Sequence, residues 1–341
     1  KEDNIMNNDN IMNNDNKPIC ILSIDGGGIK GLVLVAILEE IEKRSKKSIR
    51  DIFNFIIGTS AGGVAAIHMA FTDNKYNSCK EYRKSLERVR NVFSQYNLFR
   101  VIRKGYGCPL EPTLEVSYLC NPSKTYCNIL PPRPNKDTPH CCVLTSKRNY
   151  LGEWSPFLLR NYDNIRKLDL LEGSSDWCIS DQLLATSAAC TIFKPFEKNN
   201  EIYTDAGIIC NNPTEFAINE IRSLYPNRPI KMIVSISSGH SKINNIENID
   251  SMNLMYWIKT LVNLTINNSE RIHNLIKNIY IPNYCNFDNI KTKYYRIDPI
   301  ISDVEAKEYN IEKLNNMSNE VDKWIKDNND IFDEICKNIK E

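Results

Sequence analysis

The chain has 341 residues, 42% of them hydrophobic, a length that suits one large α/β domain or two small ones. Its 43 basic and 42 acidic residues nearly cancel, so no net field indicates a nucleic-acid partner. Twelve cysteines occur without an apolar leader or a Cys-x-x-Cys pair, which favours reduced thiols in an intracellular protein, cytoplasmic or peripheral on membranes. The longest apolar run, residues 32–38, is too short to span a membrane.

The N-terminal part of the chain alternates strand and helix signals. Residues 1–16 repeat Asp-Asn-Ile-Met-Asn-Asn, a composition that predicts a disordered leader. A β-branched apolar run at residues 19–24 predicts a buried parallel strand, and residues 32–46 follow with helical spacing. A second strand is expected at residues 53–57 and a second helix at residues 61–70.

The rest of the chain continues this alternation after a charged helix at residues 78–99 and an irregular insertion at residues 105–139, a candidate lid or substrate-shaping loop. Asn212 and Pro213 predict a helix start, with Asn212 as the N-cap. Strand and helix alternation indicates a mostly parallel sheet covered by helices on both faces. The remaining predictions are strands at 141–145, 157–160, 201–204, 230–236 and 294–297, a helix at 179–189, and mainly helix from residue 251.

A glycine-rich loop, Asp25-Gly26-Gly27-Gly28-Ile29-Lys30-Gly31, follows the first predicted strand. Consecutive glycines allow a tight turn that aims several backbone N–H groups at one point, beside the positive end of the next helix. Such a nest binds an anion, either a phosphate or the developing oxyanion of an ester. Gly26, Gly28 and Gly31 also satisfy the dinucleotide fingerprint, but its acidic residue is expected after the second strand, and Asp51 precedes that strand. Nucleotide binding by this loop is therefore the weaker interpretation.

A second turn, Gly58-Thr59-Ser60-Ala61-Gly62, joins the second predicted strand to its helix. Gly-x-Ser-x-Gly by itself is a weak signal, but the strand–turn–helix context strengthens it. A serine at the tip of such an elbow is held in strained backbone geometry, and its small neighbours leave the hydroxyl exposed. Ser60 is therefore the candidate nucleophile, and Gly58 and Gly62 support the turn.

The serine hydroxyl needs a base, and the sequence offers two candidates. His240 follows a predicted strand and comes after Ser60 and Asp205, which is the chain order of an α/β-hydrolase triad. Asp205 itself ends a strand, and a desolvated carboxylate close to the hydroxyl also serves as a base. His68 lies two helical turns from Ser60, too far to reach it, and His140 and His273 carry no signal of a role.

The three motifs, in this order, resemble those of the patatin-like phospholipases, especially their calcium-independent A2-type branch. In that family Gly-Gly-Gly-x-Arg/Lys-Gly follows a strand, and Gly-x-Ser-x-Gly and Asp-Gly-Gly/Ala come later. The corresponding segments here are residues 25–31, residues 58–62 and Asp205-Ala206-Gly207. Flanking segments at residues 53–63, 159–162, 185–189 and 211–214 also look like that branch, so the resemblance covers residues 19–240.

The resemblance implies a three-layer α/β/α patatin-like fold with a mostly parallel central sheet and C-terminal helices. Residues 17–300 would form the catalytic domain, and residues 301–341 would be helices packed on it. It implies a lipid acyl hydrolase in which Ser60 attacks an ester carbonyl and Asp205 takes its proton, without a metal or cofactor. Gly26, Gly27 and Gly28 would form the oxyanion hole, with Asp25, Lys30, Gly31 and Gly207 as supporting motif residues.

Two departures from the family pattern leave a catalytically silent lipid-binding relative as a further hypothesis. Ala206 replaces a glycine and would strain the turn if that glycine had positive φ, and Cys190 stands where proline is usual. The expected partners are a phospholipid or other acyl lipid and a peripheral membrane surface. Membrane contact by a helix around Trp257, or by the basic cluster at residues 43–50, competes with ordinary packing and with a solvated helix end.

Overall fold

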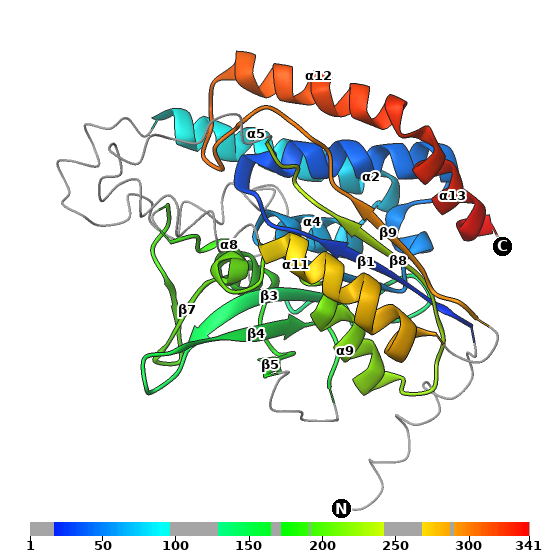
Figure 1. Ribbon diagram of the computed structural model, residues 1–341. Coiled ribbons are helices and arrows are strands. Elements are labelled where there is room, and N and C mark those ends of the chain that lie inside the picture. The colour runs from blue at the N-terminus through cyan, green and yellow to red at the C-terminus, as the bar shows by residue number, and fades with distance from the viewer. Residues whose placement is uncertain are drawn as a thin grey trace, which may run out of the picture.

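The computed structural model describes residues 17–95, 129–164, 172–190, 192–241, 268–286 and 290–340, which surround one central sheet (Figure 1). The strand order is β5-β4-β3-β2-β1-β8-β9, and a β6–β7 hairpin joins β3 beside this path. The strands are β1 (Ile19–Ile24), β2 (Phe55–Thr59), β3 (His140–Arg148), β4 (Trp154–Arg160), β5 (Gly173–Ser174), β6 (Phe196–Lys198), β7 (Glu201–Asp205), β8 (Ile230–Ile236) and β9 (Lys293–Ile297).

Five strands of the sheet, β9, β8, β1, β2 and β3, run parallel, while β4 and β7 pair antiparallel with β3. The parallel strands β1 and β2 are buried along their whole length, as their apolar composition predicts. Their carboxyl ends therefore lie at one edge of the sheet, where the loops that follow them meet.

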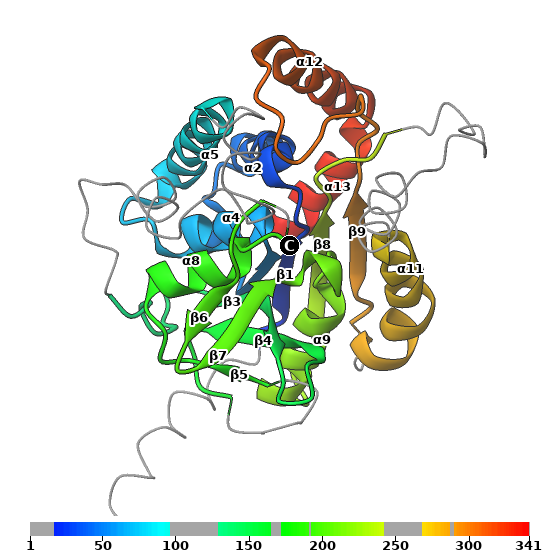
Figure 2. The same cartoon turned by 90° about the vertical axis from the view of Figure 1, so that its left-hand side faces the viewer.

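Helices cover both faces of the sheet, which makes three layers (Figures 1 and 2). Side chains of β1 alternate between the faces: Leu22 and Ile24 pack into one apolar cluster, Ile19 and Ile21 into the other. The first cluster includes α2 (Gly31–Ser45), α4 (Ala61–Phe71), α5 (Ser78–Gln95), α8 (Ile179–Ser187), α12 (Ile311–Asp327) and α13 (Asn329–Lys340). The second includes α9 (Thr214–Leu224), α11 (Asn268–Leu275) and a π-helix, η6 (Ile276–Cys285).

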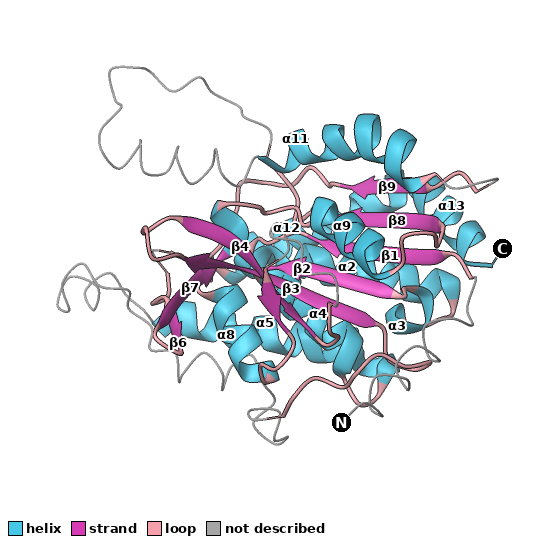
Figure 3. Cartoon of the chain, turned by 90° about the horizontal axis from the view of Figure 1, so that it is seen from below, coloured by secondary structure: helices cyan, strands magenta, loops and turns pink. Residues whose placement is uncertain are grey.

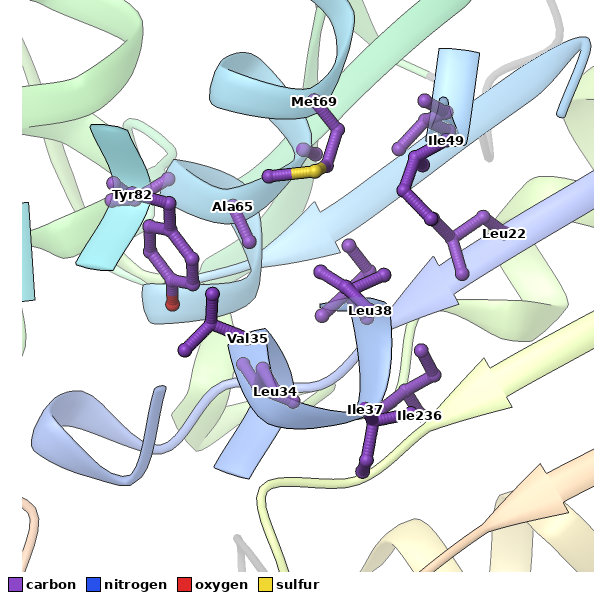
Figure 4. Packing of buried hydrophobic residues seen from close by; sticks show 14 of the residues in the cluster. Leu22, Leu34, Val35, Ile37, Leu38, Ile49, Ala65, Met69, Tyr82 and Ile236 are labelled. Atoms are coloured by element: carbon purple, nitrogen blue, oxygen red, sulfur yellow. The ribbon is translucent and has the colours of Figure 1, made fainter. Parts of the chain in front are cut away.

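The core between α2 and the sheet is continuous and consists mainly of aliphatic side chains. Figure 4 shows Leu34, Ile37 and Leu38 of α2 beside Leu22 of β1 and Ile236 of β8. These residues are fully buried, and each such side chain contributes about 1.5–3 kcal/mol of transfer free energy. The glycine loop and the serine elbow therefore each follow a strand that packs into a buried core.

Two strands meet end to end on one edge of β3, as the view in Figure 3 helps to follow. β2 pairs with β3 only as far as Thr59, opposite Leu144. From the next residue, Thr145, the same edge of β3 pairs with β7, which runs in the opposite direction and ends at Asp205. The carboxyl ends of β2 and β7 therefore face each other, and the residues that follow them are brought together.

The predicted α/β architecture, a mostly parallel sheet flanked by helices, is confirmed. Two details were wrong. Helix α9 begins at Thr214, and its N-cap is Pro213 and not Asn212. Asn212 lies one residue before the cap, where its side-chain oxygen accepts the Thr214 N–H (3.1 Å). Residues 301–310 are not helical but run as a segment across the glycine loop before α12. The leader, residues 105–128 of the insertion and the helix around Trp257 lie outside the described residues, and the domain boundary at residue 300 stays a prediction.

Candidate active site

Ser60 lies at the tip of the predicted elbow, between the end of β2 and the first turn of α4. Its backbone has φ 56° and ψ −126°, a conformation that costs of order 1–3 kcal/mol for a residue with a side chain. The buried Thr186 of α8 holds this turn, because its Oγ1 accepts the Ser60 N–H (3.0 Å) while donating to the Leu144 carbonyl (2.7 Å). The strained geometry expected of a nucleophile elbow is therefore present.

Asp205 lies opposite the elbow, as the end-to-end arrangement of β2 and β7 requires. The carboxylate accepts hydrogen bonds from the Ser60 hydroxyl and from the Gly207 N–H, the latter at 2.7 Å. Burial raises the pKa of Asp205 to about 6, and these two hydrogen bonds oppose the rise. Within the part of the chain that the structure describes, no cation contributes to that pKa.

The turn after Asp205 shows how the chain accommodates Ala206. Residues Ala206–Ile208 form a short 3-10 helix, η4, and Asp205 caps it through the bond to Gly207. Among the described residues with side chains, positive φ is confined to Lys46, Ser60, Asn199 and Asn200. Ala206 is fully buried but unstrained, so the strain expected of this substitution is absent.

The glycine loop lies against Ser60. A Cβ on Gly26 would be 2.9 Å from the Ser60 Cβ, so only a bare backbone allows this approach. Gly28 has φ +59° and faces the Ala306 carbonyl, which also accepts the Ile29 N–H (2.8 Å). Among the described residues, none accepts a hydrogen bond from the Gly27 or Gly28 amide. The loop therefore offers backbone donors beside the serine.

Asp25, which opens this loop, pairs with a residue of the edge strand β9. The two terminal nitrogens of the buried Arg296 guanidinium donate to the Asp25 carboxylate, at 3.0 and 2.6 Å. Arg296 also donates to the Ser235 hydroxyl (2.8 Å), and Ser238 donates to the Gly26 carbonyl (2.8 Å). The ends of β8 and β9 thus anchor the loop.

The other motif residues support the backbone around these groups. Gly58 lies in β2 against Gly62, and Gly62 in the first turn of α4 lies against the carbonyls that end β1. Gly31 starts α2 beside the Tyr82 ring. Lys30 is half-buried; burial lowers its pKa, which the carboxylates of Asp303 and Asp298 oppose.

His240 lies apart from the Ser60–Asp205 pair. Its Nδ1 is 3.1 Å from Asp298 Oδ1, and its backbone bridges to Pro299 and Ile301. Its side chain is half exposed. A triad needs the imidazole between serine and carboxylate, but here the Ser60 hydroxyl contacts Asp205 directly. The geometry disfavours the triad.

Sequence reasoning missed Thr186 and Arg296. Thr186 belongs to a segment that resembles the family, but no local pattern indicates that its hydroxyl would cap an elbow 126 residues away. Arg296 lies in a strand predicted only from its apolar neighbours, 271 residues from Asp25. Only the pairing of β8 with β9 makes this contact predictable.

The described residues contain no group of three or more His, Cys, Asp or Glu side chains arranged to hold a metal ion. None of their helices has the length and apolar content needed to cross a bilayer. Nine cysteines among the described residues are free thiols, and seven of them are buried.

Comparison with known proteins finds similarity to patatin-like phospholipases. A family model for patatin-like phospholipases matches residues 22–166. Human calcium-independent phospholipase A2-gamma is 23% identical over 335 residues, which cover 95% of this chain and 40% of the relative. Phospholipase A I of Arabidopsis thaliana is 28% identical over 270 residues, covering 64% of this chain and 20% of the relative. A cGAMP-activated phospholipase of Vibrio cholerae is 28% identical over 212 residues, covering 59% of this chain and 57% of the relative.

The chain spans about 40% of the length of the first of these relatives. The matched segment contains the glycine loop, the serine elbow and strands β2 to β4, and the alignment with the human relative extends over nearly the whole chain. Residues 22–166 match the model of the patatin-like phospholipase family, and the proteins to which this chain is similar include calcium-independent phospholipases A2.

Proposed function

We propose that this chain is a lipid acyl hydrolase of phospholipase A or lysophospholipase type, with Ser60 and Asp205 as a catalytic dyad. The observation that carries the proposal is the direct hydrogen bond from the Ser60 hydroxyl to a buried carboxylate with no cationic partner among the described residues. A carboxylate in that position accepts a proton near neutral pH, because burial raises its pKa to about 6. The phospholipase names of the relatives support an acyl-lipid substrate.

In the proposed mechanism, the Ser60 oxygen attacks the ester carbonyl while its proton moves to Asp205. The carbonyl oxygen becomes an oxyanion, which the Gly27 and Gly28 amides stabilise, since the Gly26 N–H already donates to the Asn211 carbonyl (3.4 Å). The tetrahedral intermediate collapses to an acyl-serine, and Asp205 returns the proton to the leaving alcohol. Water then gives a proton to Asp205 and attacks the acyl-serine carbonyl, and the Ser60 oxygen takes that proton back as it leaves, which releases the fatty acid. Every step uses residues of this chain, and none calls for a metal.

The test is fatty-acid release from mixed phospholipid vesicles in excess chelator. Ser60→Ala and Asp205→Asn should each lower release by about 10³-fold or more, whereas His240→Ala should stay within about twofold of wild type. Ser318→Ala is the matched control, because this serine lies on α12 and its hydroxyl donates to the Leu314 carbonyl and not to a carboxylate. Release that persists in Ser60→Ala would exclude the dyad; loss in His240→Ala would favour the triad. Vesicle binding without release by wild type would favour the silent relative.

The pH dependence provides a second readout. Asp205 must be ionised to accept the serine proton, so the rate on a soluble short-chain ester should rise as pH increases through about 6. Below that pH the protonated carboxyl no longer acts as a base. A rate independent of pH between 5 and 8, within the range where the protein stays folded, would contradict the role of Asp205.

The rival proposal of nucleotide binding is less well supported. Asp51, which follows the fingerprint at about the spacing expected of its acidic residue, lies in α3 (Ile49–Ile52) before β2 and pairs with Lys75 (2.8 Å). It is therefore at the edge of the sheet opposite the glycine loop. A rise in melting temperature on adding nucleotide, with unchanged activity in Ser60→Ala, would reverse this preference.

A further inference from the structure

The β3–β4 hairpin projects beyond the candidate active site. β2 ends opposite Leu144, but β3 continues through Arg148, so the last four residues of β3 extend roughly 13 Å past the elbow strand. Figure 1 shows the hairpin reaching out at the left, beyond the ends of β1 and β8. Its tip thus lies on the same edge of the sheet as Ser60.

The turn at this tip is built by side-chain as well as backbone hydrogen bonds. Asn149 Oδ1 accepts the N–H groups of Leu151 (3.0 Å) and Glu153 (2.9 Å), and its Nδ2 donates to the Glu153 carboxylate (3.0 Å). The Asn149 N–H donates to the Glu153 carbonyl (2.8 Å), and Gly152 adopts φ +85°. This turn presents its side chains in a defined arrangement without burying them.

The two side chains at the apex, Tyr150 and Leu151, are an aromatic and an aliphatic one, and the carboxylate of Glu153 in the same turn is also exposed. Tyr150 is 95% exposed and Leu151 66% exposed, and Trp154 behind them is 37% exposed. Trp154 pairs across the strands with Arg148, whose guanidinium lies beside Gly152. Adjacent exposed Tyr and Leu with Trp and Arg one step behind form the combination that suits a water–lipid boundary. In a turn facing only water, such residues gain nothing.

We propose that this hairpin tip docks on the surface of a phospholipid bilayer, with Tyr150 and Leu151 inserted and Trp154 and Arg148 at headgroup level. This rests on the proposed function, because an acyl hydrolase whose substrate is a membrane lipid must bring its serine to that membrane. The cationic Arg148 complements anionic headgroups, and the long β3 strand fixes the tip relative to the serine. A bilayer is the expected partner, because two adjacent apolar side chains exposed at the apex of a turn, with Trp154 and Arg148 behind them, suit shallow insertion between lipid headgroups.

The opposite edge of the sheet offers no comparable surface among the predicted basic residues. Arg44 pairs with Glu40 and Asp333, and Arg50 donates to the Ala70 and Thr72 carbonyls at the end of α4. These cations are already used to hold helix ends together. Membrane contact by these two arginines of the basic cluster is therefore not favoured.

The test compares variants in which exposed tyrosines at opposite edges of the sheet, Tyr150 and Tyr76, are replaced. Tyr150→Ser combined with Leu151→Ser should lower co-sedimentation with phosphatidylcholine–phosphatidylserine vesicles by about tenfold or more. Tyr76→Ser is the matched control, because Tyr76 is 68% exposed beside Lys75 but lies after the far end of α4. Arg148→Gln should weaken binding to these vesicles at low salt but not to pure phosphatidylcholine vesicles.

Hydrolysis of a soluble short-chain ester separates this inference from the proposed function. The double variant should retain wild-type ester activity and melting temperature while losing vesicle binding and vesicle hydrolysis. Unchanged vesicle binding in the double variant would overturn the docking proposal, whether or not wild type is active. A change from dimer to monomer in the double variant with vesicle binding intact would also overturn it, by assigning the tip to contact between copies. Absence of ester activity in wild type would count against the proposed function alone.

Discussion

Two buried aspartates, Asp25 and Asp205, each end a strand at the same edge of one sheet, yet their surroundings differ. Asp25 follows β1 and is held by two hydrogen bonds from the Arg296 guanidinium. Asp205 ends β7 and meets only a hydroxyl and a backbone N–H. Burial raises the pKa of both carboxyls, but the charge and hydrogen bonds of Arg296 oppose the rise at Asp25.

The difference suits Asp25 to anchoring the glycine loop and supports the proposed role of Asp205 as a base. A carboxylate gripped by a guanidinium has both oxygens engaged and does not readily take a proton from a neighbour. A buried carboxylate without a cation is costly to ionise and therefore basic. The fold places the first under the glycine loop and the second against the serine. Substitutions of Arg296 and of the two aspartates test this difference between Asp25 and Asp205.

The largest effect is expected on stability, from Arg296→Met. The substitution leaves the Asp25 charge buried without its partner, which costs about 3–5 kcal/mol in comparable pairs. Urea unfolding should reveal the loss as a lower midpoint at unchanged slope. Adding Asp25→Asn to this variant should recover part of the loss, because no unpaired charge then remains. Equal stability of the single and double variants would mean that Arg296 acts by packing alone.

A smaller effect of opposite sign is expected from Asp205→Asn. The folded-state pKa of Asp205 is raised from 3.8 to about 6, so its stabilising contribution is present below pH 3.8 and lost as pH rises through about 6. At pH 8 the asparagine variant should therefore be more stable than wild type by about 1–3 kcal/mol. The gain should shrink toward zero near pH 4.

Unfolding curves at several pH values measure this effect, and Asp137→Asn is the control because Asp137 is exposed. The control should stay within about 0.5 kcal/mol of wild type at each pH. A loss of stability in Asp205→Asn at pH 8 would contradict the view of Asp205 as an uncompensated buried charge.

The smallest effect is expected at Thr186, which touches the elbow but not the space above Ser60. Thr186→Val keeps the shape and removes the hydroxyl, leaving the Ser60 N–H without its acceptor. We expect kcat on a soluble ester to fall about tenfold, equivalent to about 1.4 kcal/mol, with KM unchanged. Thr186→Ser retains the acceptor and should be close to wild type. Identical kinetics for the two variants would show that the hydroxyl does not position the elbow.

Much of the fold was predictable because its signals are local. These signals, each confined to a few residues, are the apolar runs of β1 and β8, the helical spacing of α2 and the glycines of both turns. The two strands and the helix lie within two residues of their expected bounds. The non-helical segment at residues 301–310 was not predictable in this way. It follows the glycine loop because the Ala306 carbonyl accepts the Ile29 N–H, a contact between distant parts of the chain.

The sequence by itself determined the candidate nucleophile and the anion-binding loop, since a strained elbow and a glycine nest are properties of consecutive residues. It left the base open between Asp205 and His240. Only the tertiary structure supports the proposal of Asp205 over His240, because β2 and β7 meet end to end along β3 while His240 pairs with Asp298. The surroundings that set a carboxyl pKa come from strands far apart in the chain, so local sequence does not reveal them.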